Sequence, residues 1–138
     1  MKPPEQVKRE FVRQWVQKAE ADWRVSRYLL GDSDFHGEGI VFHAQQAAEK
    51  YLKAVLIWHQ VEFSKTHDIA RLLVLVASCD PALAESLRDV VELTPYGAEY
   101  RYPGEYPPVT PSDAREAMEM ADRVRAQVRP RLPGDTLD

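Results

Sequence analysis

The segment from His36 to His59 constrains the fold of this chain more than any other. Its apolar side chains recur every three or four residues, which is the spacing of one face of an α-helix. This face consists of Ile40, Val41, Ala44, Ala47, Ala48, Tyr51, Leu52 and Val55. Because the alanines keep the helix slim, neighbouring helices can approach it closely. The pattern therefore predicts a central helix that is buried along this face.

A second, polar stripe runs along the same predicted helix. It consists of His43, Gln46, Lys50 and Lys53, which step by three, four and three residues. Residues at this spacing share one side of a helix. Gln45 and Glu49 are one helical turn apart and fall between this stripe and the apolar face. The sequence thus predicts that one helix contributes both to the core and to a candidate polar site.

Helical spacing also runs from Glu5 to Leu30 and stops at the Gly31-Asp32 turn. Asp22 lies beside the apolar stripe of this first helix, and the sequence leaves open whether it faces a neighbouring helix or solvent. A third helix is predicted after the 64–68 segment, with Ser64 or Thr66 as its cap and Asp68 in its first turn.

Two further helices are predicted from a capping residue followed by proline, at Asp80-Pro81 and at Thr110-Pro111. The first of these helices covers residues 81–93. The second is buried through apolar residues between 114 and 128 and ends near Pro130. The residues after it, 131–138, are predicted to form a frayed tail.

The stretch 94–111, TPYGAEYRYPGEYPPVTP, contains five prolines, two glycines and four tyrosines. Prolines at this density exclude a continuous helix or a central strand. We expect a long loop whose tyrosines pack on the body of the protein. The sequence as a whole therefore predicts an all-α fold: one domain over residues 1–130, built as an up-and-down bundle of about five helices with this loop before the last one.

Composition narrows the possible functions. No apolar run approaches the roughly 20 residues that span a bilayer, and the N-terminus lacks the apolar core of a signal peptide. The only cysteine, Cys79, cannot form an internal disulfide and lies at the apolar end of a predicted helix, where a small core residue is expected. These features predict a cytoplasmic protein. A formal net charge of -4 argues against wholesale wrapping of nucleic acid.

Neither a metal site nor a cofactor is predicted. The four histidines show no His-x3-His or HExxH spacing, and the glycine-rich loops that cradle phosphates are missing. The remaining polar candidates are His43, Gln46, Lys50, Lys53, His67, Asp68, Arg101 and Tyr102. Cations beside a helix N-terminus suit a phosphate. The alternative is structural: a solvated helix face, a helix cap formed by the Thr-His-Asp segment that contains Asp68, and an arginine that stacks on tyrosines or pairs with a glutamate.

Four segments of the chain resemble the HEPN domain, a helical family of prokaryotes and higher eukaryotes. These are AEADW at 19–23, FHAQQAAEKYLKA at 42–54, KTHDI at 65–69 and RYP at 101–103. The resemblance extends over about four-fifths of the chain. It implies a helical bundle, usually a homodimer, that is often encoded next to a minimal nucleotidyltransferase. Such pairs commonly act as toxin and antitoxin, and the domain is associated with nucleotide binding or with metal-independent RNA cleavage.

Branches of the family that cleave RNA carry an arginine followed by four to six residues and a histidine, which serve as a general acid-base pair. No histidine of this chain has an arginine at that distance upstream, since Arg27 precedes His36 by eight intervening residues. The leading expectation is therefore a dimeric subunit that binds a nucleotide, a nucleotidyltransferase or both, without catalysis. A ribonuclease that assembles Arg101 and His67 in space is the second expectation. A helical dimerisation module without a small ligand is the third.

Overall fold

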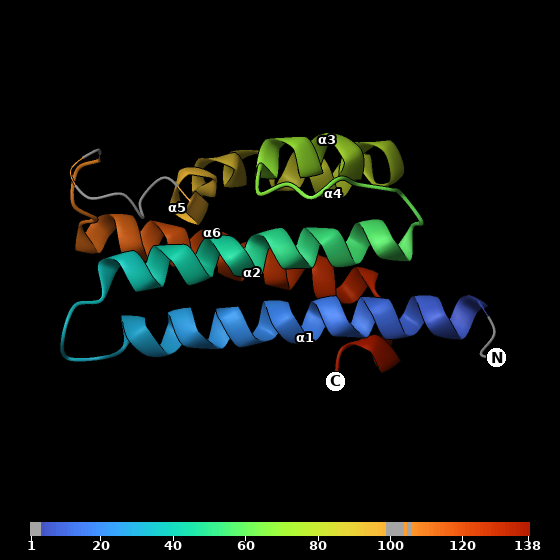
Figure 1. Cartoon of the computed structure of the whole chain (residues 1–138), viewed down its shortest axis with the longest axis horizontal. Helices are drawn as coiled ribbons and strands as arrows, with labels where there is room; N and C mark the ends of the chain where they lie inside the picture. The colour runs from blue at the N-terminus through green and yellow to red at the C-terminus, as the bar shows by residue number, and fades with distance from the viewer. Residues whose placement is uncertain (1–3, 99–103, 105) are drawn as a thin grey trace.

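The computed structural model describes residues 4–98, 104 and 106–138, and α2 (Gly37–Trp58) forms its centre. Helix α1 (Pro4–Leu30) runs along one side of α2, and α6 (Pro111–Val128) packs on another, as Figure 1 shows. The helix predicted over 36–59 is confirmed to within one residue at either end. Every residue of its predicted apolar face is at most 1% exposed. The helical spacing of the apolar positions thus places this face of α2 in the core.

A second layer covers the side of α2 away from α1 (Figure 1). It contains α3 (Ile69–Cys79), α4 (Pro81–Ser86), the 3₁₀ helix η1 (Arg88–Leu93) and α5 (Pro95–Ala98). No described residue belongs to a β-strand, which confirms the all-α prediction. None of the helices in the described ranges combines the length and the apolar character needed to cross a bilayer.

The structure differs from the prediction in this layer. The helix expected over 81–93 is divided at Leu87, and its second half is a 3₁₀ helix. Val90 and Leu93 are both buried there, because residues three apart coincide on one side of a 3₁₀ helix. The first residues of the expected long loop form the short helix α5. Helix α3 is capped by Asp68, which accepts from the backbone N–H of Ala70 at 3.0 Å, and not by Ser64 or Thr66.

The start of α6 follows the prediction. The Thr110 hydroxyl accepts from the backbone N–H of Asp113 at 3.1 Å, and the Asp113 carboxylate accepts from the backbone N–H of Thr110 at 3.0 Å. Pro111 occupies the first turn, where its missing N–H has no cost. This reciprocal capping box fixes the point at which the chain re-enters the bundle.

The C-terminal residues do not form the frayed tail that the sequence predicted. They contain two short 3₁₀ helices, η3 (Arg129–Arg131) and η4 (Gly134–Thr136), and the latter lies against α1 (Figure 1). Arg9 donates to the Asp135 carboxylate at 2.7 Å, and Arg13 donates to the Asp135 carbonyl at 2.7 Å. Thr136 is fully buried. These contacts join the last residues to the first helix.

Candidate functional site on helix α2

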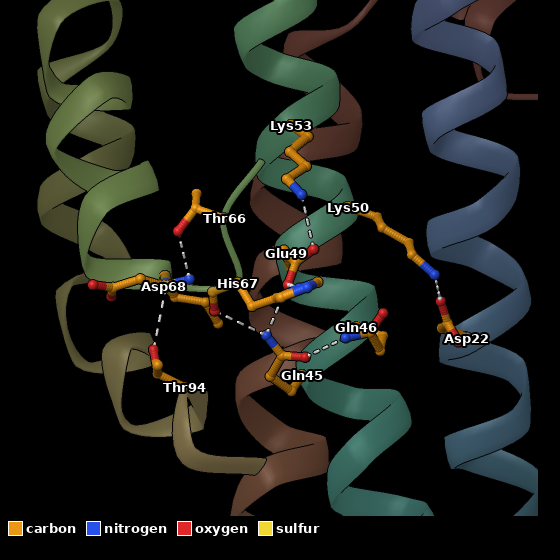
Figure 2. A network of polar contacts seen from close by, with 11 residues as sticks. Asp22, Gln45, Gln46, Glu49, Lys50, Lys53, Thr66, His67, Asp68 and Thr94 are labelled. Carbon is orange, nitrogen blue, oxygen red and sulfur yellow. Dashed lines mark hydrogen bonds and ion pairs between the residues drawn. The ribbon is translucent and has the colours of Figure 1, made fainter. Parts of the chain in front are cut away.

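Polar side chains form a network over α2, between α1 on one side and the start of α3 on the other (Figure 2). The predicted stripe supplies part of it, because positions 43, 46 and 50 lie on the partly exposed face of α2. Two carboxylates organise the network: Asp22 from α1 and Glu49 from α2. Each carboxylate accepts from both a histidine and a lysine, so the network consists of two similar clusters.

In the first cluster, Asp22 accepts from His43 Nδ1 at 2.8 Å and from Lys50 Nζ at 2.5 Å. The Asp22 side chain is only 13% exposed, which answers the question that the sequence left open: it faces the neighbouring helix α2. An ionised carboxylate only accepts hydrogen bonds, so Nδ1 carries the proton. Nε2 of His43 has no partner among the described residues, and in the neutral ring it is therefore an acceptor directed away from Asp22.

In the second cluster, Glu49 is buried and accepts from three donors. His67 Nδ1 lies 2.9 Å away, Lys53 Nζ 2.9 Å, and Gln45 Nε2 3.1 Å. The last of these nitrogens also donates to the His67 carbonyl at 3.4 Å, and Gln46 Nε2 donates to Gln45 Oε1 at 2.7 Å. These bonds hold the segment before α3 on α2, while the His67 side chain remains 69% exposed. His67 thus has the same arrangement as His43, with Nδ1 on a carboxylate.

Helix α5 brings the start of the 94–111 stretch against this second cluster. A Cβ atom at Gly97 would lie 2.8 Å from Cδ and 2.9 Å from Oε1 of the Gln45 amide, closer than side-chain atoms pack. Any side chain at position 97 would therefore require the Gln45 amide, the end of a flexible side chain, to shift. Thr94, just before α5, also contacts the start of α3, because its hydroxyl accepts from the backbone N–H of Ile69 at 3.2 Å (Figure 2). Arg101 and Tyr102, the two site residues predicted in this stretch, lie outside the described residues.

Two predicted site residues have structural contacts instead. Lys53 is 6% exposed, and its ammonium group lies over the rings of Trp15 and Phe63, at 5.3 and 5.8 Å from their centroids, as well as beside Glu49. Asp68 caps α3. Asp68 thus has the structural role, in a helix cap, that the sequence offered as the alternative to a binding role. Lys53 is a buried partner of Glu49 and is not part of a solvated stripe.

Sequence reasoning did not place Asp22, Gln45 and Glu49 among the site residues, although they orient both histidines. A signal for two of them was present, since Gln45 and Glu49 are polar residues one turn apart beside an alanine-rich buried face. The described residues contain no group of three or more His, Cys, Asp and Glu side chains suited to a metal ion. Burial raises the pKa of the Cys79 thiol, and the neighbouring Asp80 raises it further, which disfavours the thiolate.

The chain belongs to the HEPN domain family, whose model matches residues 12–130. Among solved structures it is similar to TT1696 from Thermus thermophilus, with a TM-score of 0.70, 28% identity, and coverage of 88% of this chain and 98% of the other. It is also similar to ST0689, described as an archaeal HEPN homologue, with a TM-score of 0.69, 27% identity, and coverage of 87% and 96%. A search of curated proteins gave no match.

Proposed function

We propose that this HEPN protein is a cytoplasmic homodimer that binds a nucleotide at the α2 network and acts with a minimal nucleotidyltransferase, in a pair of the toxin-antitoxin kind. One observation carries the nucleotide-binding part of the proposal: His43 and His67 are each fixed through Nδ1 by a carboxylate, and Lys50 lies in the same network. Fixed histidine rings and a lysine suit a phosphate, because protonated imidazole and ammonium donate charge-assisted hydrogen bonds to its oxygens.

The charges define the conditions under which the site attracts an anion. With both histidines neutral, Lys50 and Lys53 balance Asp22 and Glu49, so the network carries no net charge. The bound anion would therefore be attracted by the Lys50 ammonium and by hydrogen bonds from the protonated ring nitrogens that face away from the carboxylates.

The decisive experiment is calorimetric titration of the purified protein with ATP, GTP and a short RNA. Lys50→Ala and His43→Ala should each weaken nucleotide binding about tenfold, because each removes a charge-assisted contact. His59→Ala is the matched control: this histidine is exposed at the opposite end of α2. Binding that is equal in all four proteins would overturn the assignment of the site, and the absence of any binding would leave a protein partner as its ligand.

The partner is tested separately. Co-expression with the nucleotidyltransferase encoded nearest to this protein, followed by size-exclusion chromatography with light scattering, should give a complex that contains two copies of this chain. A monomer that ignores the nucleotidyltransferase would contradict this part of the proposal. If a dimer forms but binds neither nucleotide nor nucleotidyltransferase, the chain is a dimerisation module without a small ligand.

The exposed His67 ring on a buried carboxylate favours one further candidate, a metal-independent ribonuclease in which Arg101 and His67 form the acid-base pair. Cleavage of RNA in the presence of EDTA, leaving 2′,3′-cyclic phosphate ends, would support it. His67→Ala should abolish that cleavage without loss of helicity, whereas His59→Ala should not change it. Cleavage that survives His67→Ala would exclude this pair.

A further inference from the structure

A separate polar cluster, outside the α2 network, lies on the other side of α1 and is centred on Glu20. Residues 20 and 22 are about 200° apart around the helix, so Glu20 faces away from the Asp22 cluster. Arg125 from α6 donates from Nε at 2.5 Å and from Nη2 at 3.3 Å, and Arg129 donates from Nη1 at 3.3 Å. Tyr51 of α2 also donates its hydroxyl to Glu20. This carboxylate is 7% exposed.

Arginine donors exceed the acceptors available to them here. Arg24 reaches Glu20 only at 3.9 Å, beyond hydrogen-bond distance, and its side chain is 74% exposed. Arg129 uses only Nη1 among the described residues, at long distances to Glu20 and to the Tyr51 hydroxyl, so Nε and Nη2 remain available. A structural ion pair with Glu20 needs one guanidinium group, and Arg125 already provides it with two bonds. The other two arginines are therefore surplus to that pair.

These arginines line a cavity of about 390 Å³ between α1, α6 and the C-terminal residues. Its volume is within the range of small-ligand pockets. Leu137 gives it accessible apolar surface, whereas Val16 in its lining is fully buried, and three guanidinium groups meet two side-chain carboxylates, those of Glu20 and Asp138. Stacking on the Trp23 ring, 4.0 Å from its centroid, holds the Arg125 guanidinium in place. The pocket thus combines oriented cations with apolar surface.

We infer that this pocket, lined by Arg24, Arg125 and Arg129, binds the phosphate of a small phosphomonoester such as a mononucleotide or a sugar phosphate. Guanidinium groups match the planar pairs of oxygens that phosphate presents, and those of Arg125 and Arg129 are oriented before the ligand arrives. Leu137 offers apolar surface to the body of the ligand beside its phosphate. The site is independent of the α2 network, since the two share no residue.

The test is calorimetric titration with AMP, ribose 5-phosphate and adenosine. AMP and ribose 5-phosphate should bind and adenosine should not, because recognition is through the phosphate. Arg129→Gln should weaken binding at least about tenfold and Arg24→Gln by less, and both losses should shrink with added salt. Asp138→Asn should tighten binding by removing a competing carboxylate. Arg88→Gln is the matched control, an arginine that is 80% exposed and paired with Glu85.

Two further measurements keep the result distinct from that for the α2 network. Arg24→Gln should weaken ribose 5-phosphate binding more than Lys50→Ala does, whereas loss of binding in Lys50→Ala but not in Arg24→Gln would assign the ligand to α2 and overturn this inference. Because Arg129→Gln also alters a contact of Glu20, its folding is checked by thermal melting, and Arg24→Gln, at an exposed side chain, provides the independent variant. A 5′-phosphorylated RNA that binds far more tightly than ribose 5-phosphate would show an RNA end to be the ligand and overturn the small phosphomonoester. No binding of any phosphomonoester would also overturn it.

Discussion

Glu20 and Asp22 are carboxylates on the same helix, two residues apart, yet they have different surroundings. Glu20 faces α6 and accepts from two arginines and a tyrosine, and its side chain is 9% exposed. Asp22 faces α2 and accepts from one histidine and one lysine, and its side chain is 13% exposed. Loss of the Glu20 charge leaves more donors without a counter-ion than loss of the Asp22 charge does, and an unpaired charge that is partly buried is costly.

The largest effect is expected at Glu20. Glu20→Gln should lower the free energy of unfolding by about 3 kcal/mol, because it leaves arginines without their counter-ion. This is the lower end of the range for breaking a buried pair, since the arginines are partly exposed. Urea denaturation measures it, with Glu85→Gln, at a 70% exposed side chain, as the control. A loss no greater than that of the control would remove the contrast with Asp22.

Glu49 tests whether burial or membership of the α2 network decides how much a carboxylate stabilises the fold. It lies in the α2 network, as Asp22 does, but it is buried, as Glu20 is. Glu49→Gln should cost about 2 kcal/mol, since it leaves the buried Lys53 ammonium without its carboxylate. It should also release the segment before α3, which amide hydrogen exchange at Ile69 and Ala70 would report. Glu92→Gln, at an exposed position of η1, is the control. Unchanged stability would mean that burial does not decide the strength of these clusters.

The stability that the Glu20 carboxylate provides should be lost in acid. Burial by itself would raise the pKa of this carboxyl, but the hydrogen bonds from Arg125 and Tyr51 and the charges of the arginines outweigh burial and lower the pKa below its ordinary value. A carboxyl with a lowered pKa in the folded state stabilises the fold above its unfolded pKa, and this stability is lost as the pH falls through the folded pKa. The stability gap between wild type and Glu20→Gln should therefore narrow below about pH 4.5. Urea midpoints between pH 3 and 7 measure it, and a constant gap would contradict the assignment.

The smallest effect is expected at Asp22. Asp22→Asn should change the free energy of unfolding by no more than about 1 kcal/mol, because the amide oxygen still accepts one bond and water solvates His43 and Lys50. It should nevertheless alter the His43 ring, whose Nδ1 loses a carboxylate partner. NMR chemical shifts of the histidine ring protons would detect the changed surroundings of the His43 ring, with Asp34→Asn as an exposed control. A loss as large as that of Glu20→Gln would show that Asp22 is a structural residue.

Short-range sequence signals determined the helices that form the body of the fold. The apolar spacing in 36–59 predicted α2 and its buried face, and a capping residue followed by proline at Thr110-Pro111 predicted the start of α6. Both signals depend on residues a few positions apart, whose relative placement a helix fixes by itself. The same geometry predicted that His43, Gln46 and Lys50 share one face. It did not show that Lys53, which has the same spacing, is buried, because this burial depends on the rings of Trp15 and Phe63.

Only the tertiary structure decided the contacts between distant parts of the chain. Arg125 and Arg129 reach Glu20 across 105 and 109 residues, and Asp135 meets Arg9 across 126. Aspartates and arginines occur in most segments outside α2, so no local pattern distinguishes these partners from the others. The last residues therefore resembled a frayed tail, although they pack on α1 in the folded protein. Local periodicity sets which face of a helix is buried, whereas the packing of the helices sets which charges meet, and the two candidate binding sites depend on that packing.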